Sequence, residues 1–290
     1  ECTWIASAVN ITHLGARPIF ADIDRDNWCI SPQSIKEKIT KKTKVVIVID
    51  LYGNIPNMNE IQGICEAHNI WLIEDAAEAL GSSYKNIKTG KFGIGSVFSF
   101  HRTKTLSMGE GGMLLTDSDE IYGWSSWYRD LCRGQKEYYN DGIGYKYVVA
   151  PQQAALGYAQ FLRLGELIGR KREQFHNYRN IFKDIPDIQI NIDNDKIFNG
   201  CWSTVLVIGK SWKINKDEAI QKLKSIGIPT RPFFYPLSSL PAYDLSQIYK
   251  EKNPVAYDIS QRGICLPCAL NIYPDQIINI AIKIKETLFG

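Results

Sequence analysis

The sequence has almost no excess charge of either sign and no long apolar run. Its 290 residues carry 34 basic and 31 acidic side chains, mixed along the chain. A nucleic-acid-binding protein more often shows a concentrated basic face, and none is visible here. No apolar run reaches the roughly 18 residues that a membrane helix needs. These absences predict a protein that binds neither nucleic acid nor membrane, and we expect it to be cytoplasmic.

Histidine is scarce, and the cysteines follow no scaffold pattern. The four histidines are scattered, and the seven cysteines are irregularly spaced in a chain too long for a small disulfide scaffold. Cys265-Leu-Pro-Cys268 matches C-x-x-C, which raises redox or metal binding, but a zinc site needs a second pair or two nearby histidines. We therefore expect no metal site and interpret the cysteines as reduced thiols of a cytosolic protein.

Two common phosphate-binding motifs are also missing. The P-loop pattern fails at Gly90-Lys91, because Lys85 stands where its first glycine belongs and Phe92 where Ser or Thr belongs. The pattern G-x-G-x-x-G fails at Gly93-Ile94-Gly95, because Phe98 replaces its third glycine. The chain therefore carries neither a P-loop nor a dinucleotide fingerprint.

The start of the chain is unusual. Residue 1 is Glu, and neither the charged region nor the apolar region of a signal peptide follows it. The opening reads like the middle of a domain, so we expect an N-terminal segment to be missing. Apart from this, 44% hydrophobic and 22% charged residues are typical of a globular protein and exclude a disordered or collagenous one.

The first half alternates strand and helix patterns. Val45–Ile49 is an apolar, β-branched run, as expected for a strand buried on both faces of a parallel sheet. Asn57–His68 follows as a helix, with Asn57 as N-cap and Glu60 completing a capping box. Further strands are predicted at 70–73, 96–100 and 113–116. This order indicates an α/β fold with a doubly wound, mostly parallel sheet.

The second half has a different pattern. A long helix is predicted from Pro151 to about Phe182, with Ala155, Tyr158, Phe161, Leu164 and Ile168 on one apolar stripe. Shorter strand and helix patterns follow it: strands at 202–208, 230–235 and 263–266, and helices at 216–226 and 275–288. We therefore expect a large domain over residues 1–165 and a smaller C-terminal α+β domain over residues 166–290.

Polar residues follow the predicted strands, where an open α/β sheet binds its ligands. Asp75 ends one strand, and Lys104 comes 29 positions later, after the next strand and before a glycine loop at Gly109–Gly112. Such a pair suits pyridoxal phosphate, whose aldehyde binds a lysine and whose pyridine nitrogen binds a carboxylate. From the residues alone, a structural ion pair is the commoner outcome.

Segments along nearly the whole chain resemble a known family, and this resemblance favours the cofactor site over the structural ion pair. They include TWIASA (3–8), GARPIFADI (15–23), LYG (51–53), IEDAAEA (73–79), FSFHRTK (98–104), GEGGM (109–113), AALG (154–157), RPFFYP (231–236) and CLP (265–267). In this order they resemble the DegT/DnrJ/EryC1/StrS family of sugar aminotransferases. The resemblance implies a pyridoxal-phosphate-dependent transferase of fold type I, and it makes Cys265 part of a family segment rather than a redox motif.

The resemblance also implies roles for individual residues. Lys104 would bind pyridoxal 5'-phosphate as an aldimine and then act as the base in the 1,3-proton shift, and Asp75 would pair with the pyridine nitrogen. Trp4 would stack on the ring, although a core tryptophan is the alternative. Glu78 would approach the ring hydroxyl or the substrate, and Ser99 would donate to the phosphate. Sugar dehydratases of the family have histidine at the lysine position, so Lys104 disfavours that activity.

The remaining assignments concern the phosphate and the substrate. Lys146 stands where the family usually has an asparagine that reaches the cofactor phosphate of the neighbouring subunit, so it is a candidate ligand or a surface lysine. The segment expected before Glu1 carries a phosphate-binding helix start in the family. Arg231, Phe234 and Tyr235 would face the sugar nucleotide, or the arginine would lie at a domain seam.

The implied function is amination of a nucleotide-linked 4-keto-6-deoxy sugar, as in perosamine or viosamine synthesis. L-Glutamate is the expected amino donor, in a ping-pong scheme by a homodimer with shared active sites. Two alternatives stay open. One is a 3-aminotransferase of the same family, and the other is a non-catalytic relative that binds the cofactor or a sugar nucleotide.

Overall fold

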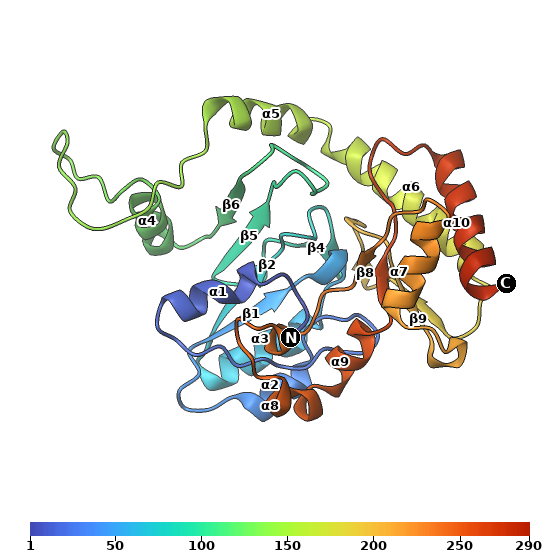
Figure 1. Ribbon diagram of the computed structural model, residues 1–290. Coiled ribbons are helices and arrows are strands. Elements are labelled where there is room, and N and C mark those ends of the chain that lie inside the picture. Colours follow the sequence, from blue (N-terminus) through green and yellow to red (C-terminus); the bar gives the residue numbers. More distant parts are fainter.

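The computed structural model describes residues 1–290 and places four strands in the sheet that carries the predicted chemistry (Figure 1). These are β1 (Val45–Ile49), β2 (Trp71–Asp75), β5 (Gly95–Ser99) and β6 (Gly112–Leu115), in the order β1-β2-β5-β6. The first three are parallel, and β6 pairs antiparallel with β5. The α/β fold with a mostly parallel sheet is therefore confirmed.

Helices α2 (Pro32–Lys38) and α3 (Met58–His68) cover the face of this sheet where its core lies, and their side chains pack with those of β1 and β2 in one apolar cluster. Helix α1 (Ala6–His13) is not part of this cluster, and its one buried residue, Ala8, packs with Phe20, Leu237 and Tyr249. Asn57 caps α3 as predicted, but Glu60 binds the side-chain amide of Asn57 instead of its backbone N–H, so the box is not closed. Val45 is exposed, and β1, at the sheet edge, is less buried than its sequence predicts.

The long helix predicted after Pro151 is two helices. They are α5 (Pro151–Phe161) and α6 (Leu164–Phe182), and Arg163 leaves the helical conformation between them at φ −107° and ψ 12°. Its guanidinium binds both carboxylate oxygens of Glu166, in the first turn of α6. The predicted stripe is also wrong for burial, because Tyr158 and Phe161 are exposed while Phe175 and Tyr178 face the core.

The second half forms an antiparallel sheet packed against helices. The sheet has the order β10-β11-β9-β7, and the helices α6, α7 and α10 share one apolar cluster with it. The remaining bounds are β7 (Ile188–Ile190), β9 (Val205–Ile208), α7 (Lys216–Ser225), β10 (Arg231–Pro232), α8 (Ser246–Lys252), α9 (Pro254–Ser260), β11 (Gly263–Cys265) and α10 (Pro274–Phe289). None of the helices combines the length and apolarity needed to cross a lipid bilayer.

A third, small sheet links the two halves. It consists of β3 (Ser83–Tyr84), β4 (Ile87–Lys88) and β8 (Ile197–Phe198), in the order β4-β3-β8. A further apolar cluster contains side chains from both halves, among them Tyr52 and Phe233. The two halves are therefore joined by strand pairing and by shared core.

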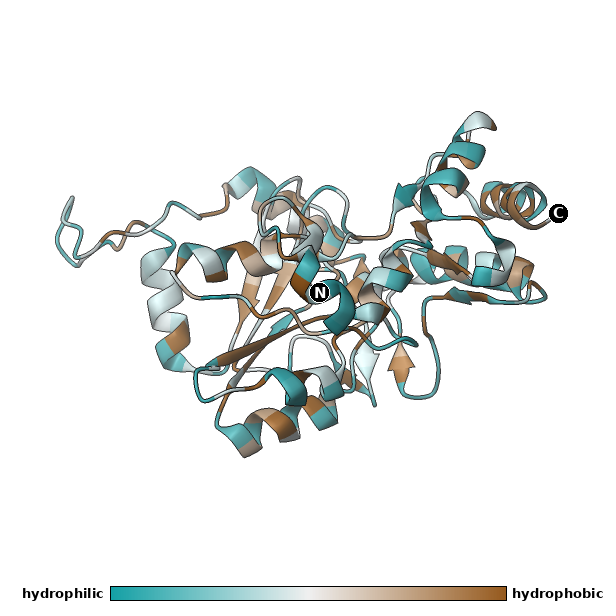
Figure 2. Cartoon of the chain, turned by 60° about the horizontal axis from the view of Figure 1, so that its bottom comes forward, coloured by the Kyte–Doolittle hydropathy of each residue, from teal (hydrophilic) through white to brown (hydrophobic).

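Between α4 (Asp119–Tyr128) and α5, residues 129–150 form an extended arm that projects from the body of the chain (Figure 1). The arm folds back on itself through backbone hydrogen bonds such as Leu131 N–H to Tyr145 O at 2.9 Å. Figure 2 shows apolar stretches along this projecting segment. Ile143 and Tyr138 are each 97% exposed, and α4 buries no residue at all. This part of the chain lacks a core of its own.

Candidate active site

The register of the parallel strands brings three chain segments to one edge of the sheet. Ile49 lies opposite Asp75, and Asp75 lies opposite Val97, so β1, β2 and β5 end side by side. The segments that leave these ends contain Tyr52, Glu78 and Lys104, respectively. Tyr52 lies in a short 3-10 turn with φ +56°. This conformation directs its backbone N–H toward Glu78, in the segment that follows β2.

Lys104 and Glu78 form the centre of the site. The Lys104 Nζ lies 3.3 Å from Glu78 Oε1, and the lysine side chain is 13% exposed. The backbone N–H of Tyr52 donates to Glu78 Oε2 at 2.9 Å. Burial raises the pKa of Glu78 above its ordinary value, and the Lys104 ammonium and the Tyr52 N–H offset part of this rise. The predicted carboxylate and amine therefore meet in a largely dry environment.

Asp75 is held in place by two donors. The Ser7 hydroxyl donates to Asp75 Oδ2 at 2.7 Å, and the backbone N–H of Ala77 donates to Oδ1 at 3.1 Å. The Ser7 hydroxyl also lies 3.4 Å from that of Thr3. Because Ser7 belongs to α1 and Asp75 ends β2, the bond fixes the helix that follows Trp4 against the strand end. Ser7 was not predicted, although its place in the segment TWIASA is a signal.

Aromatic rings form a row along the site. The Trp4 side chain is 63% exposed, and its ring centroid lies 6.4 Å from that of Phe234. Phe234 stacks on Tyr52 at 5.2 Å, and Tyr52 stacks on Trp202 at 6.0 Å, both with 8° between ring planes. Trp4 is thus not a core tryptophan, and the exposed indole is free to cover a flat ligand.

Trp202 was missed by the sequence reasoning. Its ring centre lies 3.9 Å from the Lys104 Nζ, and its indole N–H donates to the carbonyl oxygen of Thr103 at 2.7 Å. The sequence placed Trp202 at the start of a strand in the second half, whereas β9 begins only at Val205. Nothing in the local pattern indicates that this residue reaches a lysine 98 positions earlier.

Ser99 ends β5 and begins the loop to β6. Its hydroxyl accepts a hydrogen bond from the His101 backbone N–H at 3.3 Å. Two backbone bonds close the loop, from the Phe100 N–H to the carbonyl oxygen of Gly111 and from the Arg102 N–H to that of Gly109. Gly109 has φ +84° and Gly111 has φ +145°, backbone conformations that favour glycine.

Three predicted residues lie apart from this centre. The Lys146 ammonium binds the Asp130 carboxylate within the arm and contacts no other predicted residue. Arg231, in β10, is exposed and has no ion pair in the chain. Tyr235 is half exposed, and its ring lies 3.6 Å from the Nζ of Lys216, at the first turn of α7. Within a single chain, the structure thus joins Lys104 and Glu78 with the Trp202 end of the aromatic row, and it places Asp75 at the same edge of the sheet.

Below the site lies a pair of buried acids that the sequence reasoning did not single out. Asp50 follows β1, Glu74 is in β2, and both are fully buried. Glu74 Oε2 accepts from the Ser96 hydroxyl at 2.8 Å and from two backbone N–H groups. Burial, and then the charge of the nearby Glu74, raise the pKa of Asp50 well above its ordinary value. Neither carboxyl oxygen of Asp50 has a hydrogen-bond partner in the chain, so nothing but burial and the nearby Glu74 charge acts on its pKa strongly.

An apolar cavity lies outside this centre. It measures about 850 Å³, is lined mostly by apolar residues, and lies between the segment Arg17–Ile23 and the edge strand β1. Its lining includes neither Lys104 nor Glu78.

The chemistry of the central residues fits pyridoxal phosphate. A lysine amine protected from water can bond to an aldehyde, a fixed carboxylate can pair with a pyridinium, and an exposed indole can cover the ring. Lys104, Asp75 and Trp4 offer these three groups at one edge of the sheet, and the Ser99 hydroxyl at the end of β5 offers a donor for a phosphate.

Comparison with solved structures defines the class of protein. The chain matches the aminotransferase PseC of Helicobacter pylori with a TM-score of 0.91 and 26% identity, over 99% of this chain and 78% of that one. PseC is described as taking part in the biosynthesis of pseudoaminic acid. The fold is that of the pyridoxal-phosphate-dependent aminotransferases, which confirms the expected fold class.

Comparison with protein families narrows this class. Residues 1–285 match the model of the DegT/DnrJ/EryC1/StrS aminotransferase family. GDP-perosamine synthases of Vibrio cholerae and Escherichia coli O157:H7 are 34% and 36% identical to the chain, over 98% of its length and 77% and 76% of theirs. The chain belongs to the DegT/DnrJ/EryC1/StrS family and is a pyridoxal-phosphate-dependent aminotransferase.

Proposed function

We propose that the protein transfers the amino group of L-glutamate to C4 of a nucleotide-linked 4-keto-6-deoxy sugar, giving a 4-amino sugar of the perosamine or viosamine type. The observation that carries this proposal is the arrangement of Lys104, Glu78 and Asp75 at the strand ends of an aminotransferase fold. Similarity to the GDP-perosamine synthases over nearly the whole chain supports the substrate class.

Each central residue has a role in this proposal. When bound, pyridoxal phosphate supplies an aldehyde for covalent attachment and a ring that accepts electrons. Lys104 attaches the cofactor, and its freed amine moves the proton of the substrate carbon that bears nitrogen. Asp75 accepts a hydrogen bond from the pyridine N–H, and Trp4 covers the ring face. The Ser99 hydroxyl donates to the phosphate.

Glu78 is suited to exchange a proton with Lys104. Its Oε1 lies 3.3 Å from the Lys104 Nζ, and burial raises its pKa toward the range in which a carboxyl group can act as acid or base. Glu78 can therefore hold a proton that Lys104 gives up and return it later in the cycle. It also lies where a ring hydroxyl or the substrate would approach.

The substrate side of the site is assigned to the segment 231–236. Phe234 is the neighbour of Trp4 in the aromatic row, and the ring of Tyr235 packs against the ammonium of Lys216. The exposed Arg231 offers a fork that matches the oxygens of a diphosphate. These three residues would bind the sugar nucleotide, with aromatic faces for its rings and a cation for its phosphates.

The active form would be a homodimer with shared active sites. The arm and α4 present exposed aromatic and aliphatic side chains with no core behind them, and a second copy of the chain can bury these side chains. Lys146 lies on the arm and would reach the cofactor phosphate of the neighbouring subunit. It would have to exchange its bond to Asp130 for that contact.

The role of Lys104 is tested with the purified protein. The wild type should absorb near the edge of the visible range and lose this absorption when L-glutamate is added, because the cofactor leaves the lysine. Lys104→Ala should lose the absorption and at least about 10²–10⁴-fold in transamination rate. The matched control is Lys91→Ala, since Lys91 is exposed and outside the site. Undiminished turnover by Lys104→Ala would contradict the proposal.

The substrate is tested by a screen of UDP-, dTDP- and GDP-linked 4-keto-6-deoxy sugars with L-glutamate. Formation of a 4-amino sugar from one of them, with 2-oxoglutarate as co-product, would support the proposal. Amination at C3 would favour the 3-aminotransferase alternative. A protein that binds the cofactor but does not bleach with any amino donor would favour the non-catalytic alternative.

A further inference from the structure

The ammonium of Lys104 lies on the face of an aromatic ring from the other half of the chain. Its Nζ is 3.9 Å from the ring centre of Trp202 and 3.3 Å from Glu78 Oε1. A cation over an indole face is attracted by the ring quadrupole, and the attraction grows when water is excluded, as it is around this 13% exposed side chain. Trp202 and Glu78 thus hold the amine from two sides.

These contacts form a closed ring of four residues. The Tyr52 backbone N–H binds Glu78 at 2.9 Å, Glu78 binds Lys104, Lys104 lies on Trp202, and the Trp202 ring stacks on that of Tyr52 with 8° between the planes. Each member therefore restrains two others. A lysine in such a ring has few rotamers open to it, although a free lysine side chain has many.

The position of Trp202 is set by its own neighbours in the chain. The indole N–H donates to the Thr103 carbonyl oxygen, which belongs to the residue before Lys104. On its other side, Cys201 has φ +55° and its N–H binds the Asn199 side chain at 2.7 Å. The backbone turn that delivers the indole is therefore fixed by hydrogen bonds at both ends.

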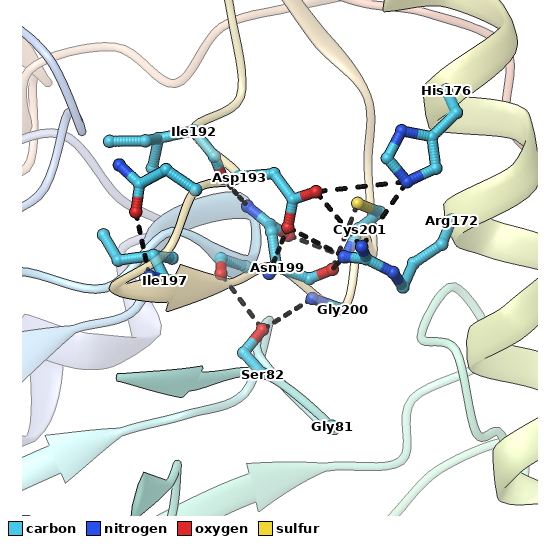
Figure 3. Close-up of polar contacts among 12 residues, drawn as sticks. Gly81, Ser82, Arg172, His176, Ile192, Asp193, Ile197, Asn199, Gly200 and Cys201 are labelled. Atoms are coloured by element: carbon cyan, nitrogen blue, oxygen red, sulfur yellow. Dashed lines mark hydrogen bonds and ion pairs between the residues drawn. The ribbon is translucent and has the colours of Figure 1, made fainter. Parts of the chain in front are cut away.

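A buried polar network anchors this turn to both halves of the chain (Figure 3). The Gly200 N–H donates to the Ser82 hydroxyl at 2.8 Å, and a Cβ on Gly200 would lie only 2.7 Å from the Leu80 carbonyl oxygen. Arg172, from α6, donates to the Asn199 carbonyl oxygen at 2.6 Å and is itself held by Asp193 at 2.8 Å. These hydrogen bonds restrain the Asn199–Cys201 turn from both halves of the chain.

We propose that Trp202 is a positioning residue for Lys104: its indole face, fixed by the Asn199–Cys201 turn and by Thr103, holds the lysine ammonium beside Glu78, the group that can take its proton before the nitrogen bonds to the cofactor aldehyde. The inference rests on the proposed role of Lys104. In the bonding step the Lys104 ammonium would first give one proton to Glu78, 3.3 Å away. The amine nitrogen would then add to the aldehyde carbon, and the aldehyde oxygen would leave as one molecule of water with the two remaining nitrogen protons. Trp202 takes no part in the bond change and acts only on the direction of the amine.

The test compares covalent with non-covalent binding of the cofactor. Hydroxylamine removes the cofactor from the wild type, Trp202→Leu, Trp202→Phe and the control Trp71→Leu, whose exposed indole begins β2 at the end away from Asp75. Pyridoxal phosphate is then added, and attachment to Lys104 is followed by absorbance and by borohydride trapping with peptide mapping. In parallel, the Kd is measured for pyridoxamine phosphate, which has no aldehyde and forms no bond with lysine.

Trp202→Leu should attach pyridoxal phosphate about five- to tenfold more slowly than the wild type, with the Kd for pyridoxamine phosphate changed less than twofold. Trp202→Phe keeps an aromatic face, so its attachment rate should lie between those of the wild type and Trp202→Leu. The attachment rate of Trp71→Leu should match that of the wild type.

Attachment by Trp202→Leu at the wild-type rate would overturn the inference. Equal losses in attachment and in pyridoxamine phosphate affinity would also overturn it, because they indicate a structural role. Failure of the wild type to attach the cofactor at Lys104 would instead refute the proposed function itself.

Discussion

At the scale of single residues, the most unusual feature is the pair of carboxyl groups buried beneath the site. Asp50 is fully buried beside Glu74, and its pKa is raised well above the ordinary value by burial first and by the neighbouring carboxylate second. The folded protein thus retains the Asp50 proton to a higher pH than the unfolded chain, which releases it above about pH 4. Folding therefore takes up this proton, and a rise in pH weakens the folded state through it.

Asp50→Asn keeps the size of the side chain but has no ionisable proton to lose. We expect the free energy of unfolding of the wild type to fall, relative to Asp50→Asn, as the pH rises from 5 to 8. The relative slope can reach about 1.4 kcal/mol per pH unit below the folded pKa of Asp50. Urea unfolding followed by circular dichroism at several pH values measures this difference. Parallel curves for the two proteins would show that Asp50 is ionised in the folded state.

The residue scale also marks how far the sequence could predict the site. Asp75, Glu78 and Lys104 were predictable because they follow strands, and parallel strands bring their ends to one edge. Ser7 and Trp202 reach the same place through single side-chain contacts set by tertiary packing, and no local pattern encodes such contacts. The roles proposed for Lys146 and Arg231 remain predictions, since both depend on a partner subunit or a bound substrate.

At the scale of elements, the sequence predicted bounds well where the pattern of apolar residues or a capping residue marks them clearly. The run Val45–Ile49 became β1 without a change of bounds, and Asn57 caps α3. The helix predicted after Pro151 was wrong in its length, because the break falls at Arg163, an ordinary helix-forming residue, while the nearby Gly165 lies inside α6. Its expected apolar stripe was also wrong, because the exposed side chains of α5 give the same periodic pattern as a core face.

The cap of α7 offers a prediction at this scale. The Asn215 side chain accepts from the N–H groups of Asp217 and Glu218 at 3.0 Å, and the Glu218 carboxylate accepts from the Asn215 N–H. This capping box begins the helix whose first residue, Lys216, supports Tyr235. Asn215→Ala should therefore lower the free energy of unfolding by about 1 kcal/mol and loosen the proposed substrate side of the site.

Chemical denaturation measures the first effect, and the KM for the sugar nucleotide measures the second. Lys222→Ala, an exposed position on the same helix, is the matched control and should change neither quantity noticeably. Equal stability of Asn215→Ala and Lys222→Ala would mean that the box contributes nothing beyond intrinsic helix propensity.

At the scale of the whole molecule, two apolar cores account for most of the fold. One lies under the parallel sheet and the other under α6, α7 and α10. On this basis we propose domains at 1–165 and 166–290, with the apolar cluster around Tyr52 and Phe233 between them. Composition and periodicity predict two cores, but they do not reveal that β8 pairs with β3 across this division.

The segment between the two cores leads to the last prediction. The arm and α4 bury almost nothing in a single chain, so their apolar side chains should form the contact with a second copy. Ile143→Asp places a charge at a 97% exposed position of the arm and should leave monomer stability unchanged. In the dimer the charge would be desolvated without a partner, so the dissociation constant should rise at least about tenfold.

Sedimentation velocity over a concentration series measures this change. Ile226→Asp, at an exposed apolar position at the end of α7, is the matched control and should stay dimeric. Because Lys146 would serve the neighbouring subunit, Ile143→Asp should also lose cofactor affinity on dilution, in step with dissociation. Dissociation without any loss of cofactor affinity would show that each site is complete within one chain. Wild-type association by Ile143→Asp would place the subunit contact outside the arm.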